Sequence, residues 1–171
     1  MPIAVNLSMH DLHDARLLDR VAGLLEQWHV RPVNLIVEIT ESGFMMDPAR
    51  TLETVSGLRL LGVRTAIDDF GTGYSSLAYL KRLPVDELKI DKSFVQNLAS
   101  DPDDLAIVRS TIRLGQDLGL HVTAEGVEDA SSFSLLRELG CDVAQGYYIG
   151  RPRPADELIA ELRPNAALVN A

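Results

Sequence analysis

The chain contains the stretch Arg64-Thr65-Ala66-Ile67-Asp68-Asp69-Phe70-Gly71-Thr72-Gly73-Tyr74-Ser75-Ser76, in which an apolar run leads into two adjacent carboxylates and a glycine-rich loop. Residues 64–67 predict a β-strand whose carboxyl end carries Asp68 and Asp69. Two like charges at a strand end repel each other unless a cation or hydrogen-bond donors offset the repulsion. One aspartate could cap the following turn, but the pair predicts a bound divalent cation.

Short β-branched runs of the same kind alternate with amphipathic stretches along the chain. This alternation is typical of βα units around a parallel sheet, and it predicts an α/β fold. The expected strands are residues 3–7, 35–39, 64–67, 87–90, 121–124 and 143–144.

The stretches between these strands predict helices with recognisable ends. Asp47 before Pro48 is a good N-cap followed by a proline at the first helical position. Gly62, Gly119 and Gly140 follow their helices, as expected of left-handed C-terminal residues. The expected helical segments are residues 11–28, 48–61, 77–82, 102–118, 130–139 and 154–162.

Almost every expected strand ends in a polar residue that its apolar neighbours would not favour. The carboxyl ends of parallel strands lie on one face, where the βα loops of barrel enzymes and open sheets build their sites. We therefore expect the strand-end residues to share one site. They are Asn6, Glu38, Asp68, Asp69, Lys89, Glu125 and Gln145.

Several of these residues have a structural alternative to a functional role. Asn6 could cap the following turn with Ser8. Lys89, between two apolar neighbours, is either a buried ion-pair partner or a group directed at phosphate or water. Glu128 is also explained as a surface glutamate. Glu38 is harder to explain structurally, because a carboxylate between Val37 and Ile39 is costly to bury.

Composition limits the classes of protein. With 171 residues, 46% hydrophobic and 24% charged, one globular domain is expected, at 1–163, with a tail at 164–171. The net charge of −9 gives a nucleic-acid polymer no electrostatic support as a partner. The apolar runs are too short to span a membrane, and the N-terminus lacks the pattern of a signal peptide, so a cytoplasmic location is expected. Cys141 alone cannot form an internal disulfide.

Oxygen ligands dominate the candidate site. This donor set favours Mg²⁺ or Mn²⁺ over zinc, and His10 and His13 are interpreted as solvated residues. The loop at Gly71, Thr72 and Gly73 could cradle a phosphate or act as a gate, but it lacks the Gly-Lys-Ser ending of a P-loop.

The motif series of this chain resembles that of the EAL family of cyclic di-GMP phosphodiesterases. The resemblance covers essentially the whole chain, in order and spacing. It implies a (β/α) barrel of the TIM type. The matching motifs are Val5-Asn6-Leu7-Ser8, Glu38-Ile39-Thr40-Glu41, Asp68-Asp69-Phe70-Gly71-Thr72-Gly73-Tyr74-Ser75-Ser76, Leu88-Lys89-Ile90-Asp91, Ala124-Glu125-Gly126-Val127-Glu128 and Gln145-Gly146-Tyr147.

The resemblance implies hydrolysis of cyclic di-GMP to linear pGpG with two divalent cations. By motif position, Asn6, Glu38 and Asp68 resemble the ligands of one metal ion. Asp68, Asp69 and Glu125 resemble those of the second, and Lys89 resembles the residue that holds the attacking water. The resemblance further implies that Glu41 secures the glycine-rich loop and that Gln145 contacts water or the metal shell. It also implies that Glu128 is a supporting residue near the substrate.

The sequence departs from the family at its beginning, because it contains no Glu-Ala-Leu. One ligand of the first metal ion is thereby missing, and about six of the eight strands of a closed barrel are expected. A barrel that is incomplete at its N-terminus leaves two unpaired edges. We therefore expect a homodimer or an additional N-terminal segment to complete it. The alternative to an enzyme is a catalytically inactive module that binds cyclic di-GMP.

Overall fold

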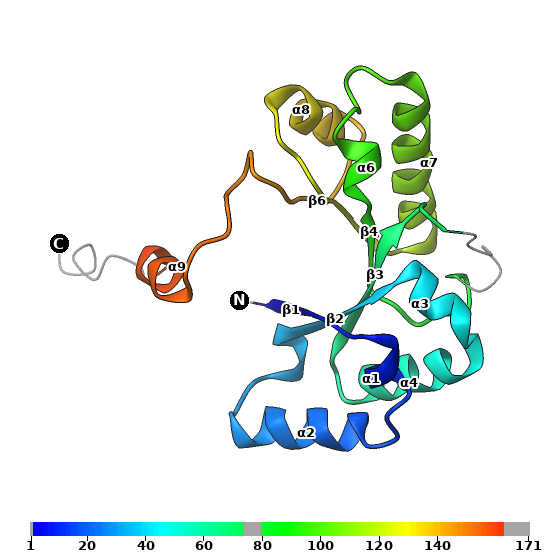
Figure 1. The fold of residues 1–171 in the computed structure, drawn as a ribbon, viewed down its shortest axis with the longest axis vertical. Helices are drawn as coiled ribbons and strands as arrows, with labels where there is room; N and C mark the ends of the chain where they lie inside the picture. Colours follow the sequence, from blue (N-terminus) through cyan, green and yellow to red (C-terminus); the bar gives the residue numbers. More distant parts are fainter. Residues whose placement is uncertain (1, 74–79, 163–171) are drawn as a thin grey trace.

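The computed structural model describes residues 2–73 and 80–162. Six parallel strands form one sheet, and their order in space is their order in the chain. This arrangement is an incomplete (β/α) barrel of the TIM type, as expected from the sequence (Figure 1). The strands are β1 (Ile3–Asn6), β2 (Leu35–Thr40), β3 (Arg64–Phe70), β4 (Glu87–Ile90), β5 (His121–Ala124) and β6 (Val143–Ala144).

The helices occupy the connections between the strands and the segment after β6. Figure 1 shows α9 at the end of an extended connection that leaves the sheet after β6. None of the described helices combines the length and the hydropathy needed to cross a bilayer. The helical elements are α1 (Met9–Leu12), α2 (Leu17–Gln27), η1 (Pro32–Asn34), α3 (Glu41–Met46), α4 (Pro48–Leu60), α6 (Lys92–Val95), α7 (Pro102–Leu118), α8 (Ala130–Glu138) and α9 (Ala155–Leu162).

The core lies between one face of the sheet and the helices that cover it. Alternate residues of a strand point to opposite faces, so Val37 and Ile39 lie on the covered face while Glu38 lies on the other. In the same way Leu88 and Ile90 flank Lys89 in β4. The apolar side chains of this core include Val37, Ile39, Val55, Leu58, Ile67, Leu88, Ile90, Val108, Ile112, Val122 and Leu136.

The two outer strands of the sheet carry exposed apolar side chains. Ile3 and Val5 in β1 are 60% and 45% exposed, and Val143 in β6 is 48% exposed. Within the described part of the chain, each outer strand has one neighbour: β1 pairs with β2, and β6 pairs with β5. The sheet is therefore open between β1 and β6, and backbone groups of both edges remain available for pairing.

Two expected elements differ in the structure by more than one residue at an end or by a break. The strand expected at 64–67 continues to Phe70, because a register shift lets it pair with β4 beyond the aspartates. The single helix expected at 11–28 is divided into α1 and α2. Asp14 lies in the break, where its carboxylate accepts a hydrogen bond from the backbone N–H of Arg16 and pairs with Arg20.

Two short α-helices, α3 and α6, and the 3₁₀ helix η1 were not expected from the sequence. Helix α3 begins after Thr40, whose hydroxyl accepts a hydrogen bond from the N–H of Gly43. Helix α6 begins after Asp91, whose carboxylate accepts one from the N–H of Ser93. Thr40 and Asp91 are thus side-chain N-caps. Such caps accept hydrogen bonds from N–H groups of the first turn, which have no partner within the helix. The expected segment 77–82 lies partly outside the described residues, and the tail at 164–171 lies wholly outside them.

Candidate active site

Neighbouring strands place their polar ends side by side on the face of the sheet opposite the core. In the strand register Asn6 pairs with Glu38, and Thr40 pairs with Asp68. Lys89 pairs with Thr123, two residues before Glu125. Because residues paired across parallel strands point to the same face, the sequence pattern brings these side chains together.

Lys89 lies at the centre of the resulting cluster. Its Nζ is 2.7 Å from Glu38 Oε1, 3.1 Å from Asp68 Oδ1 and 2.6 Å from Glu125 Oε1. The lysine is 4% exposed, and Glu38 and Asp68 are also buried. Strands β2, β3 and β4 and the residue after β5 thus bring together one buried ammonium and three carboxylates. Lys89 makes the ion pairs that the sequence gave as one of two alternatives.

These contacts keep Lys89 protonated. Burial alone would lower the pKa of Lys89, but the hydrogen bonds from Nζ to Glu125 and Glu38 outweigh burial and raise it. A lysine in this state is a cationic hydrogen-bond donor, and it has no free electron pair with which to accept a proton.

The two aspartates of β3 are separated by a local distortion of the strand. The register with β4 shifts between Ile67 and Phe70, and Asp69 has a left-handed backbone with a φ of 55°. In a regular strand adjacent side chains would point to opposite faces. Here carboxylate oxygens of Asp68, Asp69 and Glu125 lie within 4.8 Å of one another. The bulge therefore makes both aspartates available to one site.

The carboxylates of this group are held close together against their mutual repulsion. Burial, followed by the charges of Asp68 and Asp91, raises the pKa of Asp69. Burial also raises the pKa of Glu125, although hydrogen bonding to Lys89 opposes the shift. Crowded carboxylates of this kind are typical of functional sites and of metal sites.

Asp91 belongs to the site although the sequence analysis gave it no role. Its negative charge contributes to the raised pKa of Asp69. Burial alone would raise the pKa of Asp91, but hydrogen bonds from Ser93 outweigh it and lower the pKa. The signal for it was its position two residues after Lys89, on the same side of the strand end.

The donor set fits a hard divalent cation. Four carboxylates, Glu38, Asp68, Asp69 and Glu125, face one ammonium group, and negative charge is in excess when all are ionised. Carboxylate oxygens are the preferred ligands of Mg²⁺ and Mn²⁺. Bound cations would compensate the excess charge, so the residues present fit such ions.

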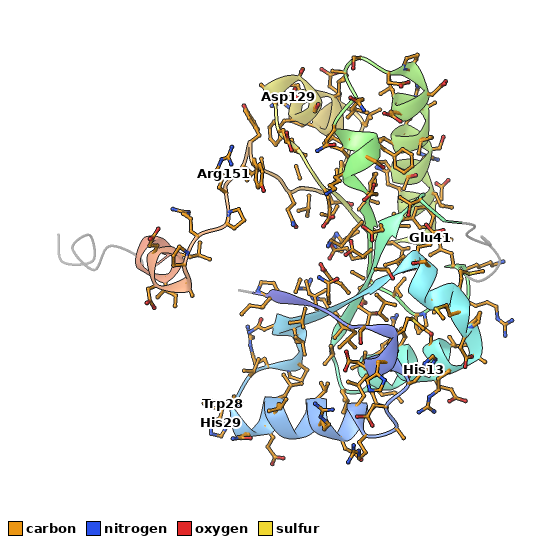
Figure 2. All side chains as sticks on the ribbon, viewed as in Figure 1. His13, Trp28, His29, Glu41, Asp129 and Arg151 are labelled. Atoms are coloured by element: carbon orange, nitrogen blue, oxygen red, sulfur yellow. The ribbon has the colours of Figure 1, made fainter. Side chains whose placement is uncertain are left out.

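Glu41 joins α3 to the glycine-rich loop. Its Oε2 accepts hydrogen bonds from the backbone N–H of Gly71, at 2.8 Å, and of Gly73, at 3.4 Å. Thr72 bonds locally instead, because its hydroxyl donates to the carbonyl of Asp69. Figure 2 labels Glu41 where α3 approaches the carboxyl end of β3. The resemblance implies that Glu41 secures this loop, and its two hydrogen bonds to the loop backbone are consistent with that role.

Two further expected residues, Glu128 and Gln145, line a cavity beside Glu125. The cavity has a volume of about 240 Å³. Glu128 Oε1 accepts a hydrogen bond from Gln96 Nε2 at 3.2 Å. The backbone N–H of Gln145 donates to the carbonyl of Ala124, which fixes β6 against β5. Asn6 is exposed on the edge strand β1, opposite Glu38 in the register.

The EAL domain family matches residues 1–152 of the chain. The chain belongs to the EAL family. Among EAL relatives, it is 48% identical over 160 residues to the bifunctional diguanylate cyclase/cyclic di-GMP phosphodiesterase MucR of Pseudomonas aeruginosa. That alignment covers 94% of the chain and 23% of MucR, so the chain spans about a quarter of the length of this relative.

Solved EAL structures have the same fold. The PaMucR phosphodiesterase in complex with c-di-GMP is 48% identical and superposes with a TM-score of 0.89, covering 92% of this chain and 64% of that one. The EAL domain of Mycobacterium smegmatis DcpA is 42% identical, with a TM-score of 0.91 over 95% of this chain and 72% of that one. The Klebsiella pneumoniae BlrP1 manganese/cy-diGMP complex is 33% identical, with a TM-score of 0.83 over 88% and 39% of the two chains.

Proposed function

We propose that this chain hydrolyses cyclic di-GMP to linear pGpG with the aid of two divalent cations, Mg²⁺ or Mn²⁺. The observation that carries the proposal is the contact of Lys89 with three strand-end carboxylates beside Asp69. This constellation supplies an ammonium donor and carboxylate ligands of the kind that metal-assisted phosphodiester hydrolysis uses. The cyclic di-GMP complexes of PaMucR and BlrP1 support the choice of substrate.

The reaction adds one water molecule across a phosphodiester bond. The water oxygen forms a bond to phosphorus, the bond from phosphorus to the 3′ oxygen breaks, and that oxygen leaves with a proton. Bound divalent cations would lower the pKa of the water and stabilise the charge on the phosphoryl oxygens. Asn6, Glu38 and Asp68 are proposed to hold one cation. Asp68, Asp69 and Glu125 are proposed to hold the other, with Asp68 shared.

Lys89 is proposed to orient the attacking water. As a protonated donor, its Nζ can hold a water oxygen in place of one of its present carboxylate partners. Glu41 is proposed to fix the loop at Gly71 and Gly73 beside this water through its two backbone hydrogen bonds. Positioning of this kind accelerates a reaction because it removes the entropic cost of bringing the reactants together.

The alternative is a module that binds cyclic di-GMP without turning it over. The sequence contains no Glu-Ala-Leu, which supplies one ligand of the first cation in the family. All the other motif residues are present, and the proximity of Glu38, Asp68, Asp69, Lys89 and Glu125 supports a shared site. We therefore favour hydrolysis.

The deciding experiment incubates the purified chain with cyclic di-GMP and Mn²⁺ or Mg²⁺, with a chelator in the control. The products are separated by chromatography, and binding is measured in parallel. Linear dinucleotide that forms only with metal supports hydrolysis. Intact substrate that is nevertheless bound supports the binding module, and no binding contradicts both.

The open edges of the sheet are proposed to be covered by another polypeptide segment. The exposed Ile3, Val5 and Val143 side chains on β1 and β6 support this proposal. A second copy of the chain, giving a homodimer, and strands of an N-terminal segment are the two candidates. Sedimentation at low concentration tests the dimer, because a compact monomer contradicts it.

A further inference from the structure

A second polar contact lies on the same face of the sheet as the Lys89 cluster. The hydroxyl of Thr123 in β5 donates a hydrogen bond to Oε1 of Glu87 in β4, at 2.5 Å. Thr123 is 2% exposed, and it lies opposite Lys89 in the register of the two strands. A hydroxyl bonded to a carboxylate at this distance forms a charge-assisted hydrogen bond, so the pair is held firmly beside the lysine.

Glu87 is within reach of the ammonium group of Lys89. The two residues are two positions apart in β4, so their side chains leave the strand on the same face, with Cα atoms about 6.6 Å apart. Among the described residues, however, Lys89 forms its ion pairs with the three carboxylates of the cluster and not with Glu87. The hydrogen bond from Thr123 holds the Glu87 carboxylate on the side of β5 instead.

The side chain of Lys89 crosses a neighbouring strand to reach the cluster. Strand β3 lies between β4 and β2, and Nζ of Lys89 in β4 is 2.7 Å from Oε1 of Glu38 in β2. Ala66 of β3 is level with both Glu38 and Glu87 in the strand register, and its methyl group leaves room for this crossing. Lys89 is thus directed across β3, whereas Glu87 is bound toward β5.

Glu87 becomes a competitor for Lys89 when divalent cations occupy the cluster. This step rests on the proposed function, in which Glu38, Asp68 and Glu125 ligate the cations. The ammonium group of Lys89 is repelled by bound cations and shares the same carboxylate oxygens with them. Glu87 is not among the proposed ligands, so its charge stays available. A Glu87 carboxylate without its hydroxyl donor would then attract Lys89 away from the cluster.

We propose that Thr123 is a positioning residue, whose hydroxyl binds Glu87 and thereby keeps Lys89 directed at the attacking water. Thr123 contacts neither the water nor the phosphodiester in this role, and it acts through the two side chains of β4. Glu87 retains its charge, but its carboxylate is occupied by a neutral hydroxyl at 2.5 Å. Removal of that hydroxyl should therefore redirect Lys89 while every residue of the proposed site stays in the sequence.

The first variant of the test is Thr123→Val, which keeps the branched shape of the side chain and removes the hydroxyl. We expect kcat for cyclic di-GMP to fall by about 100-fold, the effect of a displacement of about 1 Å at a reacting group. The Kd for Mn²⁺, measured by calorimetry without substrate, should fall by roughly 5-fold or more, because the carboxylates then lose their ammonium competitor. A general loss of stability does not combine slower turnover with tighter cation binding.

Two further variants and a control assign the effect to Glu87. Thr123→Val combined with Glu87→Gln removes the competing charge, so kcat and the Kd for Mn²⁺ should both return toward the wild-type values. Thr123→Ser keeps a hydroxyl and should resemble wild type. Thr65→Val is the matched control, because Thr65 is also a buried strand threonine, and its hydroxyl has no hydrogen-bond partner in the part of the chain that the structure describes.

The outcomes separate this inference from the proposed function. Slower turnover with tighter Mn²⁺ binding in Thr123→Val, both reversed by Glu87→Gln, supports the positioning role. A Thr123→Val chain that equals wild type, or one whose losses Glu87→Gln does not reverse, overturns the role and leaves the proposed function standing. Wild-type chain that binds Mn²⁺ but forms no linear dinucleotide contradicts the proposed function. The Mn²⁺ affinities then decide alone: tighter binding that Glu87→Gln reverses supports the control of Lys89 by Thr123, and unchanged binding overturns it.

Discussion

Glu41 holds the backbone of Gly71 across 30 positions of sequence, through a hydrogen bond of 2.8 Å from the glycine N–H to Oε2. Gly71 has a φ of 101°, and a Cβ at this position would lie 3.0 Å from the ring of Phe94. The loop is therefore held between α3 and α6, and glycine is required for both the dihedral angle and the space. Glu41 is 2% exposed, and its Oε1 is buried without a hydrogen-bond partner in the described structure.

Removal of the Glu41 carboxylate should uncouple this loop from the site. Glu41→Ala is expected to reduce kcat/KM for cyclic di-GMP by about 100-fold, the effect of a displacement of about 1 Å at a reacting group. Glu41→Gln keeps one oxygen that can accept from Gly71, so a smaller loss is expected. Steady-state kinetics with circular dichroism as a check of folding measures both. Equal activity of Glu41→Ala and wild type contradicts a role in loop positioning.

Asp68→Asn should abolish metal-dependent turnover while the fold is kept. The amide retains the shape of the side chain but removes the charge of the residue proposed to bridge two cations. Loss of at least about 100-fold in kcat is expected, since the residue belongs to the proposed metal site. Asp19→Asn, at an exposed position of α2, is the matched control. Unchanged turnover in Asp68→Asn contradicts the bridging role.

The sequence predicted the strands well because each apolar run was bounded by polar or turn residues. All six occur, and Glu38, Asp68, Asp69, Lys89 and Glu125, at the carboxyl ends of four of them, lie close together. The sequence did not predict that Lys89 contacts Glu38 and Glu125, because sequence spacing does not reveal which strand ends meet at one side chain. This contact depends on the register of four strands.

The bulge at Asp68 and Asp69 could not be predicted from the sequence. Periodicity of two assigns the aspartates to opposite faces, and only the pairing of Phe70 with Ile90 reveals the shift. The short helix α3 had a local signal in Thr40, which caps it three residues before Gly43. The signal was weak because Glu41, the first helical residue, is a buried carboxylate whose partners lie 30 or more residues away.

Asp129 should stabilise α8 in a manner that depends on pH. It caps the helix, and hydrogen bonds from Ser131 and Ser132 lower its pKa from the ordinary 3.8 to about 2. A lowered pKa in the folded state means that the stabilisation is complete above about 3.8 and is lost as the pH falls through about 2. Asp129→Ala is expected to reduce the free energy of unfolding by about 0.5–2 kcal/mol at pH 7.

Urea unfolding of wild type and Asp129→Ala at pH 7 and pH 3 measures this effect. The difference between the two proteins should narrow at pH 3, where an unfolded aspartate is largely protonated. Asp129→Asn should lose less stability, because asparagine is an equally good cap. A difference of the same size at both pH values would show that the charge of Asp129 does not contribute.

Lys89→Met should make the stability of the chain depend on divalent cations. The substitution leaves the carboxylates of Glu38, Asp68 and Glu125 without their common ammonium partner, and removing one partner of a buried ion pair costs about 3–5 kcal/mol. In chelator the variant should therefore unfold at a lower temperature than wild type. Mn²⁺ should raise its Tm by more than it raises that of wild type, because the cation then supplies the only positive charge in the cluster. Lys81→Met, at an exposed lysine, is the matched control. If Mn²⁺ raised the Tm of Lys89→Met and of wild type by the same amount, Lys89 and the cation would not be competing for these carboxylates.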